Sequence, residues 1–174
     1  PVAANAALKN QTTPQPTLAI LDTALDTSLP IFKDKIAYEA CILDYASCTN
    51  GSKTMFGTGA AGMPIGWMKV GGFDHGTQMT SAAIQANPNI NIVFVRIADI
   101  TSAGNSVNTP ESLIKAIDWV SKNAAKYSID AVSISQSSIS ADNLAKCTTD
   151  TTTINAVNSL IKQNIPTFAA TGND

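Results

Sequence analysis

The stretch Thr17-Leu18-Ala19-Ile20-Leu21 is a short, almost wholly apolar run near the start of the chain. Runs of this length and composition are typical of strands that are buried on both faces. Three further runs share the pattern, at residues 91–97, 130–135 and 166–171, and residues 35–38 are a candidate fifth strand. The sequence therefore predicts a sheet built largely from buried strands.

Helical patterns occupy the intervals between these runs. Thr109 and Pro110 are favourable residues at the N-cap and first position of a helix, and apolar residues follow at helical spacing: Leu113, Ile117, Val120 and Ala124. Residues 151–163 repeat this pattern, and residues 77–86 form a shorter candidate helix. Buried strands that alternate with helices predict an α/β fold, a doubly wound parallel sheet with helices on both faces.

Two segments depart from this alternation. Residues 1–16 are expected to form an N-terminal arm, because Pro14 and Pro16 oppose regular structure at its end. Residues 40–73 are rich in Gly and Thr and show no clear period. We expect them to form a long, insertion-like loop within one domain that spans residues 17–174.

Composition excludes several classes of protein. The 174 residues carry 11 Lys and Arg against 13 Asp and Glu, so the chain lacks the basic surface that nucleic-acid binding requires. No apolar run approaches the roughly 18 residues of a membrane helix, so no membrane partner is expected. Charged residues are only 14%, whereas Thr, Ser and Asn together supply 48 residues. This neutral polarity is compatible with secretion.

The three cysteines leave two interpretations open. Cys41 and Cys48 are close enough in sequence to form a disulfide in a loop, which would indicate an oxidising compartment. The alternative is that both, together with Cys147, remain unpaired thiols. Zinc binding is not expected, because His75 is the single histidine and no Cys-x-x-Cys spacing occurs. We assign no metal ligands.

Residues 57–62, Gly-Thr-Gly-Ala-Ala-Gly, match the Gly-x-Gly-x-x-Gly pattern of dinucleotide-binding proteins. That chemistry needs a strand before the glycines and a helix N-terminus after them, where the pyrophosphate binds. The flanking residues Lys53, Thr54 and Pro64 predict neither element. We therefore expect a flexible loop and no nucleotide cofactor.

Two titratable residues are candidates for acid–base chemistry. Asp22 comes directly after the first buried strand, and ligands collect at the carboxyl ends of strands in open parallel sheets. His75 stands at the entry to a candidate helix, and histidine takes and returns protons near neutral pH. Ordinary alternatives exist for both: Asp22 as a turn cap, and His75 as a surface residue.

Two polar segments leave the later strands. The last strand ends in Gly172-Asn173, and an amide at this edge of the sheet can donate to a developing oxyanion. Ser135, Gln136 and Ser137 follow the third strand, where small polar residues allow a peptide backbone to approach. The alternatives are a strand-to-turn exit for the first segment and a serine-rich loop for the second.

Taken in order, these four segments resemble the subtilisin-like serine proteases. Residues 18–23 resemble the family's buried strand that ends in Asp-Ser/Thr-Gly, and residues 75–77 resemble its His-Gly-Thr-His helix entry. Residues 132–135 resemble the strand before its substrate edge, and residues 170–173 resemble its Ala-x-Gly-Asn oxyanion segment. The resemblance spans about residues 17–174 and implies a subtilisin-like fold.

The resemblance also implies roles for the matching residues. His75 would be the general base and then the general acid, and Asp22 would hold its tautomer and stabilise the imidazolium. The side chain of Asn173 would donate to the tetrahedral oxyanion. The backbone of residues 135–137 would pair with a peptide substrate as an added strand. The family commonly binds calcium, but no acidic cluster here has recognisable loop spacing, so no ligand is assigned.

The chain departs from the family pattern at several positions. Ala24 and Ser137 replace glycines, and Gln78 stands where a second histidine is usual. The family's Gly-Thr-Ser-Met-Ala segment, which carries the nucleophile, does not occur, and residues 79–82 belong to the candidate helix after His75. The chain therefore resembles the first half to two-thirds of a protease domain.

The resulting prediction is a serine endopeptidase whose Ser-His-Asp triad takes its serine from outside this chain, so that the chain alone is inactive. The alternative is a non-catalytic pseudo-protease or peptide-binding module on the same scaffold, which Ala24 and Ser137 favour. Expected partners are a peptide or protein substrate, and either the rest of the domain as a separate chain or a second copy bound at the exposed sheet edge. The expected location is secreted or extracytoplasmic.

Overall fold

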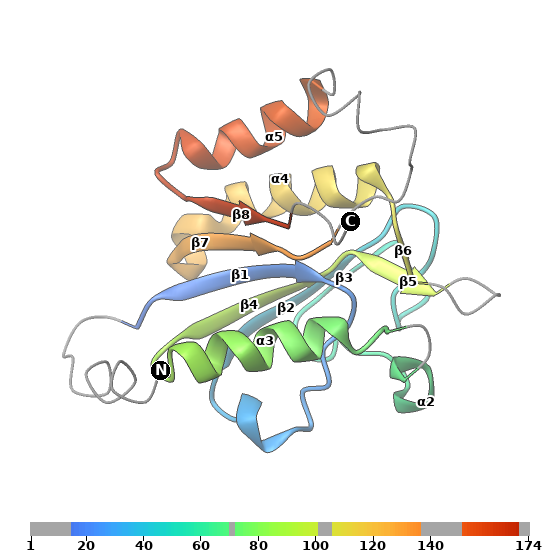
Figure 1. The fold of residues 1–174 in the computed structure, drawn as a ribbon. Helices are drawn as coiled ribbons and strands as arrows, with labels where there is room; N and C mark the ends of the chain where they lie inside the picture. The colour runs from blue at the N-terminus through green and yellow to red at the C-terminus, as the bar shows by residue number, and fades with distance from the viewer. Residues whose placement is uncertain (1–14, 70–71, 101–105, 137–150, 171–174) are drawn as a thin grey trace.

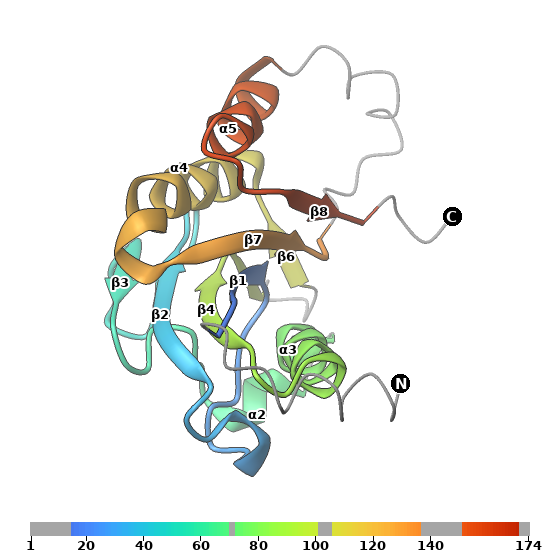
Figure 2. The ribbon, with the colours of Figure 1, turned by 90° about the vertical axis from the view of Figure 1, so that its left-hand side faces the viewer.

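A six-stranded sheet forms the centre of the computed structural model, which describes residues 15–69, 72–100, 106–136 and 151–170. The spatial order is β3-β2-β4-β1-β7-β8 (Figures 1 and 2). The strands are β1 (Thr17–Asp22), β2 (Ile36–Ile42), β3 (Thr54–Phe56), β4 (Asn91–Arg96), β7 (Ile129–Ile134) and β8 (Thr167–Ala169). All neighbours pair in parallel except β2 and β3. A separate antiparallel pair joins β5 (Ala98–Ile100) and β6 (Ser106–Asn108).

Helices cover both faces of the sheet, which confirms the predicted α/β, doubly wound architecture. One face is covered by α4 (Pro110–Tyr127) and α5 (Thr151–Ile161), and the other by α3 (His75–Ala86) and the 3-10 helix η1 (Pro30–Phe32) (Figures 1 and 2). A short helix, α2 (Ile65–Met68), precedes α3. Within the described ranges, no helix is both long and apolar enough to span a membrane.

The alternation of side chains along β1 decides where its last residue points. Ala19 and Leu21 belong to the core beneath α4 and α5, whereas Ile20 packs in the core on the α3 side. Successive side chains of a strand point to opposite faces. Asp22 is two residues after Ile20, so its carboxylate lies on the face covered by α3.

The predicted helices are present, with two boundaries that differ: α5 ends at Ile161, two residues before the predicted end, and α3 begins early. Thr109 caps α4 as expected: its Oγ1 accepts a hydrogen bond from the Ser112 N–H at 3.0 Å. By contrast, α3 begins at His75, two residues before the predicted start. Asp74 makes no side-chain cap there; instead the Gly76 N–H is bound by Thr23 Oγ1, 2.9 Å away. Local sequence rules missed this start because Thr23, whose hydroxyl accepts the hydrogen bond of the Gly76 N–H, lies 53 positions away in the chain.

Residues 40–73 contain more regular structure than their sequence indicates. They include the end of β2, the strand β3 and the helix α2. The expectation that neither a strand nor a helix flanks the glycine-rich segment is therefore wrong, although β3 is a three-residue strand paired antiparallel at the sheet edge and α2 is a four-residue helix. In this segment the N–H groups of Gly59 and Ala61 both donate to Oε2 of the buried Glu39. Two N–H groups of this loop are therefore already hydrogen-bonded to a carboxylate of the protein itself.

The structure joins Cys41 and Cys48 in a disulfide, which decides between the two interpretations that the sequence left open. The bond connects β2 to the loop that follows it. It constrains the unfolded chain and thereby stabilises a segment with little regular structure. Cys147 and residues 1–14 of the predicted arm lie outside the described residues.

Packing of α4 against the sheet is expected to dominate the stability of its face. Ile117 is fully buried in that core, whereas Ile161 on α5 is 56% exposed. Ile117→Ala should lower the free energy of unfolding by about 2–5 kcal/mol, because it removes buried methyl groups and leaves a cavity. Ile161→Ala, the same chemical change at an exposed site, should cost about 0.5 kcal/mol or less. Urea unfolding checks both, and equal losses would contradict the packing described.

Candidate active site

Asp22 is a fully buried carboxylate at the carboxyl end of β1. Its Oδ1 atom accepts three hydrogen bonds: from the Thr23 N–H at 2.6 Å, from Gln136 Nε2 at 2.8 Å and from His75 Nδ1 at 2.9 Å. Its Oδ2 atom lies 3.1 Å from the same His75 nitrogen. Donors from three separate parts of the chain therefore converge on one charge.

His75 is the first residue of α3, and its side chain is 36% exposed. The ring nitrogen that faces Asp22 is Nδ1. A carboxylate accepts hydrogen bonds only, so the contact favours the tautomer that is protonated on Nδ1. In that tautomer Nε2 carries the lone pair and can accept a proton. The pair therefore has the arrangement of a general base with its orienting carboxylate.

Close packing between α3 and the turn after β1 brings the pair together. A Cβ atom on Gly76 would lie 2.7 Å from Phe94 Cζ and 2.8 Å from the Ala24 carbonyl oxygen. It would also approach Asp22 Cβ to 3.2 Å. Glycine is the residue that permits this approach. The predicted match to a His-Gly-Thr entry thus has a steric basis in this chain.

Two threonines fasten the same junction. Thr23 Oγ1 donates to the Phe73 carbonyl at 2.8 Å and accepts from the Gly76 N–H. Thr77 Oγ1 donates to the Ala24 carbonyl at 3.2 Å and accepts from the Asp26 N–H at 3.0 Å. Each hydroxyl both donates and accepts a hydrogen bond. Together these bonds join the start of α3 to the turn after β1.

Burial sets the electrostatics of the site. Desolvation raises the pKa of Asp22 above its ordinary value, and the hydrogen bonds from His75 and the Thr23 N–H lower it in part. The net direction is upward. An ionised Asp22 therefore depends on its donors.

The structure describes some of the other predicted site residues and not others. Ser135 and Gln136 follow β7 and are half-buried, and the Gln136 side chain reaches the Asp22 carboxylate. Ser137 and Asn173 lie outside the described residues. Ala24, where the family has glycine, is buried in the turn, and positive φ outside glycine occurs in the described chain at Asp34, Ser128 and Asn164 only. The turn accepts the Ala24 side chain without a left-handed backbone.

Sequence reasoning missed Arg96, which lies beside Asp22 in the register of β4 with β1. Its guanidinium is buried, bonds Asp99 Oδ1 at 2.9 Å and the Gly62 carbonyl at 3.1 Å, and lies 5.4 Å from the Phe73 ring centre. Burial lowers the pKa of Arg96, and Asp99 partly opposes this. The sequence did offer a signal for this residue, because an arginine inside an otherwise apolar strand must be buried with a partner for its charge. Arg96 helps to fix the segment that leads into His75.

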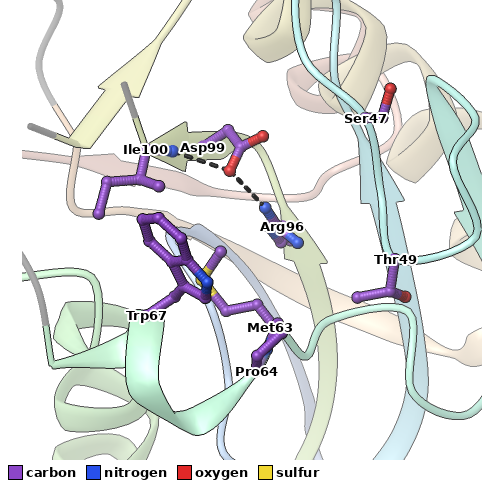
Figure 3. A pocket seen from close by; sticks show the side chains of 8 residues that line it. All are labelled: Ser47, Thr49, Met63, Pro64, Trp67, Arg96, Asp99 and Ile100. Carbon is purple, nitrogen blue, oxygen red and sulfur yellow. Dashed lines mark hydrogen bonds and ion pairs between the residues drawn. The ribbon is translucent and has the colours of Figure 1, made fainter. Parts of the chain in front are cut away.

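Arg96 and Asp99 also line a cavity of about 300 Å³ (Figure 3). Its other walls are mixed in character, with Met63, Pro64, Trp67 and Ile100 apolar and Ser47 and Thr49 polar. Of the predicted site residues that the structure describes (Asp22, His75, Ser135 and Gln136), none lines it. Across the described ranges, no group of three or more His, Cys, Asp or Glu side chains is arranged to hold a metal ion.

Comparison with known proteins supports the fold. No family model matches the chain, and no curated protein matches it. Among solved structures, the prenylagaramide maturation protease PagA is similar at 19% identity and a TM-score of 0.59, over 97% of this chain and 50% of PagA. The PatG macrocyclase in complex with peptide is similar at 16% identity and a TM-score of 0.50, over 98% of this chain and 55% of PatG. The chain thus spans about half the length of these two neighbours, and at these identities the similarity establishes a shared fold.

The close approach at Gly76 leads to a first prediction for the site. Gly76→Ala should lower the free energy of unfolding by about 1–3 kcal/mol, because the added Cβ meets the Phe94 ring and backbone. Gly66→Ala is the matched control: Gly66 lies in α2 with no atom within 4 Å of an added Cβ, so stability should be unchanged or slightly higher. Urea unfolding of both variants measures the difference. Equal stabilities would mean that the junction is looser than described.

The raised pKa of Asp22 gives stability a definite dependence on pH. Between the ordinary value of 3.8 and the raised native value, the native state keeps the Asp22 proton while the unfolded state has lost it. The contribution of Asp22 to stability therefore falls as pH rises through this interval. Asp22→Asn has no such titration, so its stability relative to wild type should increase across the interval by about 1.4 kcal/mol per pKa unit. Denaturant unfolding from pH 3 to 7 checks this, and the opposite slope would contradict it.

Proposed function

We propose that this chain supplies the acid–base part of a subtilisin-like serine endopeptidase. The observation that carries the proposal is the 2.9 Å contact between His75 Nδ1 and the buried Asp22 carboxylate. This contact lies at the carboxyl edge of a parallel sheet whose fold is shared with a maturation protease and a macrocyclase.

In the proposed reaction, His75 Nε2 takes the proton of a serine hydroxyl as the serine oxygen attacks the peptide carbonyl. Asp22 keeps Nδ1 protonated and stabilises the imidazolium that forms. His75 then returns the proton to the leaving amine, and a water molecule repeats the sequence to release the acyl group. Asn173 is proposed to donate to the oxyanion, and the backbone of residues 135–137 to pair with the substrate.

The nucleophile is proposed to come from outside these 174 residues, since the family's Gly-Thr-Ser-Met-Ala segment is not among them. Ser81, in the superficially similar segment after His75, does not fit this role. Its hydroxyl donates to the Thr77 carbonyl at 2.8 Å within α3. A hydroxyl used in this way gives His75 no proton to take.

The proposed partners are a peptide substrate and the remaining part of the domain. PatG is described in complex with peptide, which supports a peptide ligand for this scaffold. At the β8 side of the described sheet, Phe168 is 63% exposed and Ile161 on α5 is 56% exposed. Burial of these side chains would favour docking of further protease sequence, or of a second copy. The disulfide supports a secreted or extracytoplasmic location.

The chain by itself is expected to show no serine labelling by an active-site phosphonate, since the proposed nucleophile is absent from it. A protein encoded by the full gene, read past the codon for Asp174, is expected to contain a Gly-Thr-Ser segment and to be labelled there. Labelling of a serine within these 174 residues would contradict the assignment of the nucleophile. Peptide binding by the full protein without labelling or turnover would replace the endopeptidase with a binding module.

Substitutions in the full protein then test the roles of the pair. His75→Ala and Asp22→Asn should each lower kcat by about 10⁴-fold, because the proton acceptor or its correct tautomer is lost. Asp34→Asn, at an exposed aspartate whose left-handed backbone suits asparagine, should leave kcat unchanged. Full activity in either of the first two variants would overturn the proposal.

A further inference from the structure

Gln136 makes side-chain contacts with both Asp22 and His75, and the proposed reaction gives its side chain no role. Its Nε2 donates to Asp22 Oδ1 at 2.8 Å and lies 3.2 Å from His75 Nδ1. Its Oε1 lies 3.5 Å from Nδ2 of Asn108 in β6, a long hydrogen bond. One amide therefore touches both members of the acid–base pair and a residue of a separate strand.

Chemistry fixes which end of the amide faces the site. A carboxylate offers acceptors only, so an amide turned the other way would place its oxygen against Asp22 Oδ1 and be repelled. With the amide nitrogen in place, Oδ1 receives donors from Gln136, Thr23 and His75. Since Asp22 is fully buried, each donor compensates for water that the carboxylate has lost.

The same amide can also bind the wrong tautomer of His75. When Nδ1 is protonated, Gln136 Nε2 and His75 Nδ1 are both donors and share the carboxylate between them. When Nδ1 is unprotonated, Gln136 can donate to it directly, because the two nitrogens are 3.2 Å apart. The carboxylate contact, at 2.8 Å, is the shorter one and keeps the amide on Asp22.

We propose that Gln136 is a positioning residue, whose amide anchors Asp22 Oδ1 and so fixes the His75 tautomer. The proposal rests on the function proposed above. Gln136 also belongs to the segment whose backbone is proposed to pair with substrate. A peptide bound along residues 135–137 would hold the Gln136 backbone, so substrate binding and the geometry of the acid–base pair would be coupled through one residue.

Nuclear magnetic resonance of this chain tests the inference, since His75 is its single histidine and gives one imidazole signal set. In Gln136→Met, which keeps the length of the side chain and removes its donor, the pKa of Asp22 should rise by about one unit. The His75 Nδ1 proton should exchange with water at least about tenfold faster. Gln136→Glu, with nearly the same shape, should raise the Asp22 pKa further, because it adds a like charge.

Gln163→Met is the matched control, because Gln163 is exposed and bonds Ser121 and Ser159 rather than the site. It should leave the Asp22 titration and the exchange rate at their wild-type values. If Gln136→Met disturbs the fold, the near-isosteric Gln136→Glu variant decides the question. An Asp22 titration unchanged in a folded Gln136→Met or Gln136→Glu variant would overturn the inference.

Separate measurements test the role of Gln136 and the proposed endopeptidase activity. Neither the Asp22 titration nor proton exchange at His75 requires turnover, so both report on the contact even if the full protein is not an enzyme. In an active full protein, Gln136→Met should lower kcat by about tenfold or more, while Gln163→Met leaves it unchanged. An unchanged kcat together with a shifted Asp22 titration would reject the positioning role and retain the endopeptidase.

Discussion

The buried charge of Asp22 is the constraint on which the arrangement of this site depends. A carboxylate removed from water persists as an anion only when donors replace its hydration. The Thr23 N–H, His75 and Gln136 provide those donors, and they come from the turn after β1, the start of α3 and the segment after β7. Satisfying one carboxylate therefore fixes three parts of the chain relative to one another. The same contacts orient the imidazole.

Steric fit makes this convergence possible. Gly76 allows α3 to approach the end of β1 more closely than a Cβ would permit, and the hydroxyls of Thr23 and Thr77 join the two elements. A second charged residue, Arg96, is satisfied next to this junction by Asp99 and by backbone carbonyls. Its guanidinium also packs near the Phe73 ring, two residues before His75. Position, rather than an unusual residue type, gives His75 its proposed role.

Similarity to PagA and PatG extends over nearly all of this chain but only about half of theirs. The described sheet exposes Phe168 beside β7, on the side where further subtilisin-like sequence is proposed to dock. The acid–base pair does not depend on that half for its geometry, since every donor to Asp22 described above lies between residues 23 and 136. A site assembled in one half of a domain and completed by the other is consistent with the proposed function.

The sequence by itself determined the fold class, five strands (β1, β2, β4, β7 and β8), the approximate positions of three helices and the two titratable residues that meet. It could do so because local composition and residue spacing are enough to predict buried strands, amphipathic helices and helix caps. The tertiary structure decided the start of α3 at His75, the Cys41–Cys48 pairing, the short strand β3 and the contact of Gln136 with Asp22. Each of these depends on groups far apart in the chain, and no local period or propensity encodes a hydrogen bond across 114 residues.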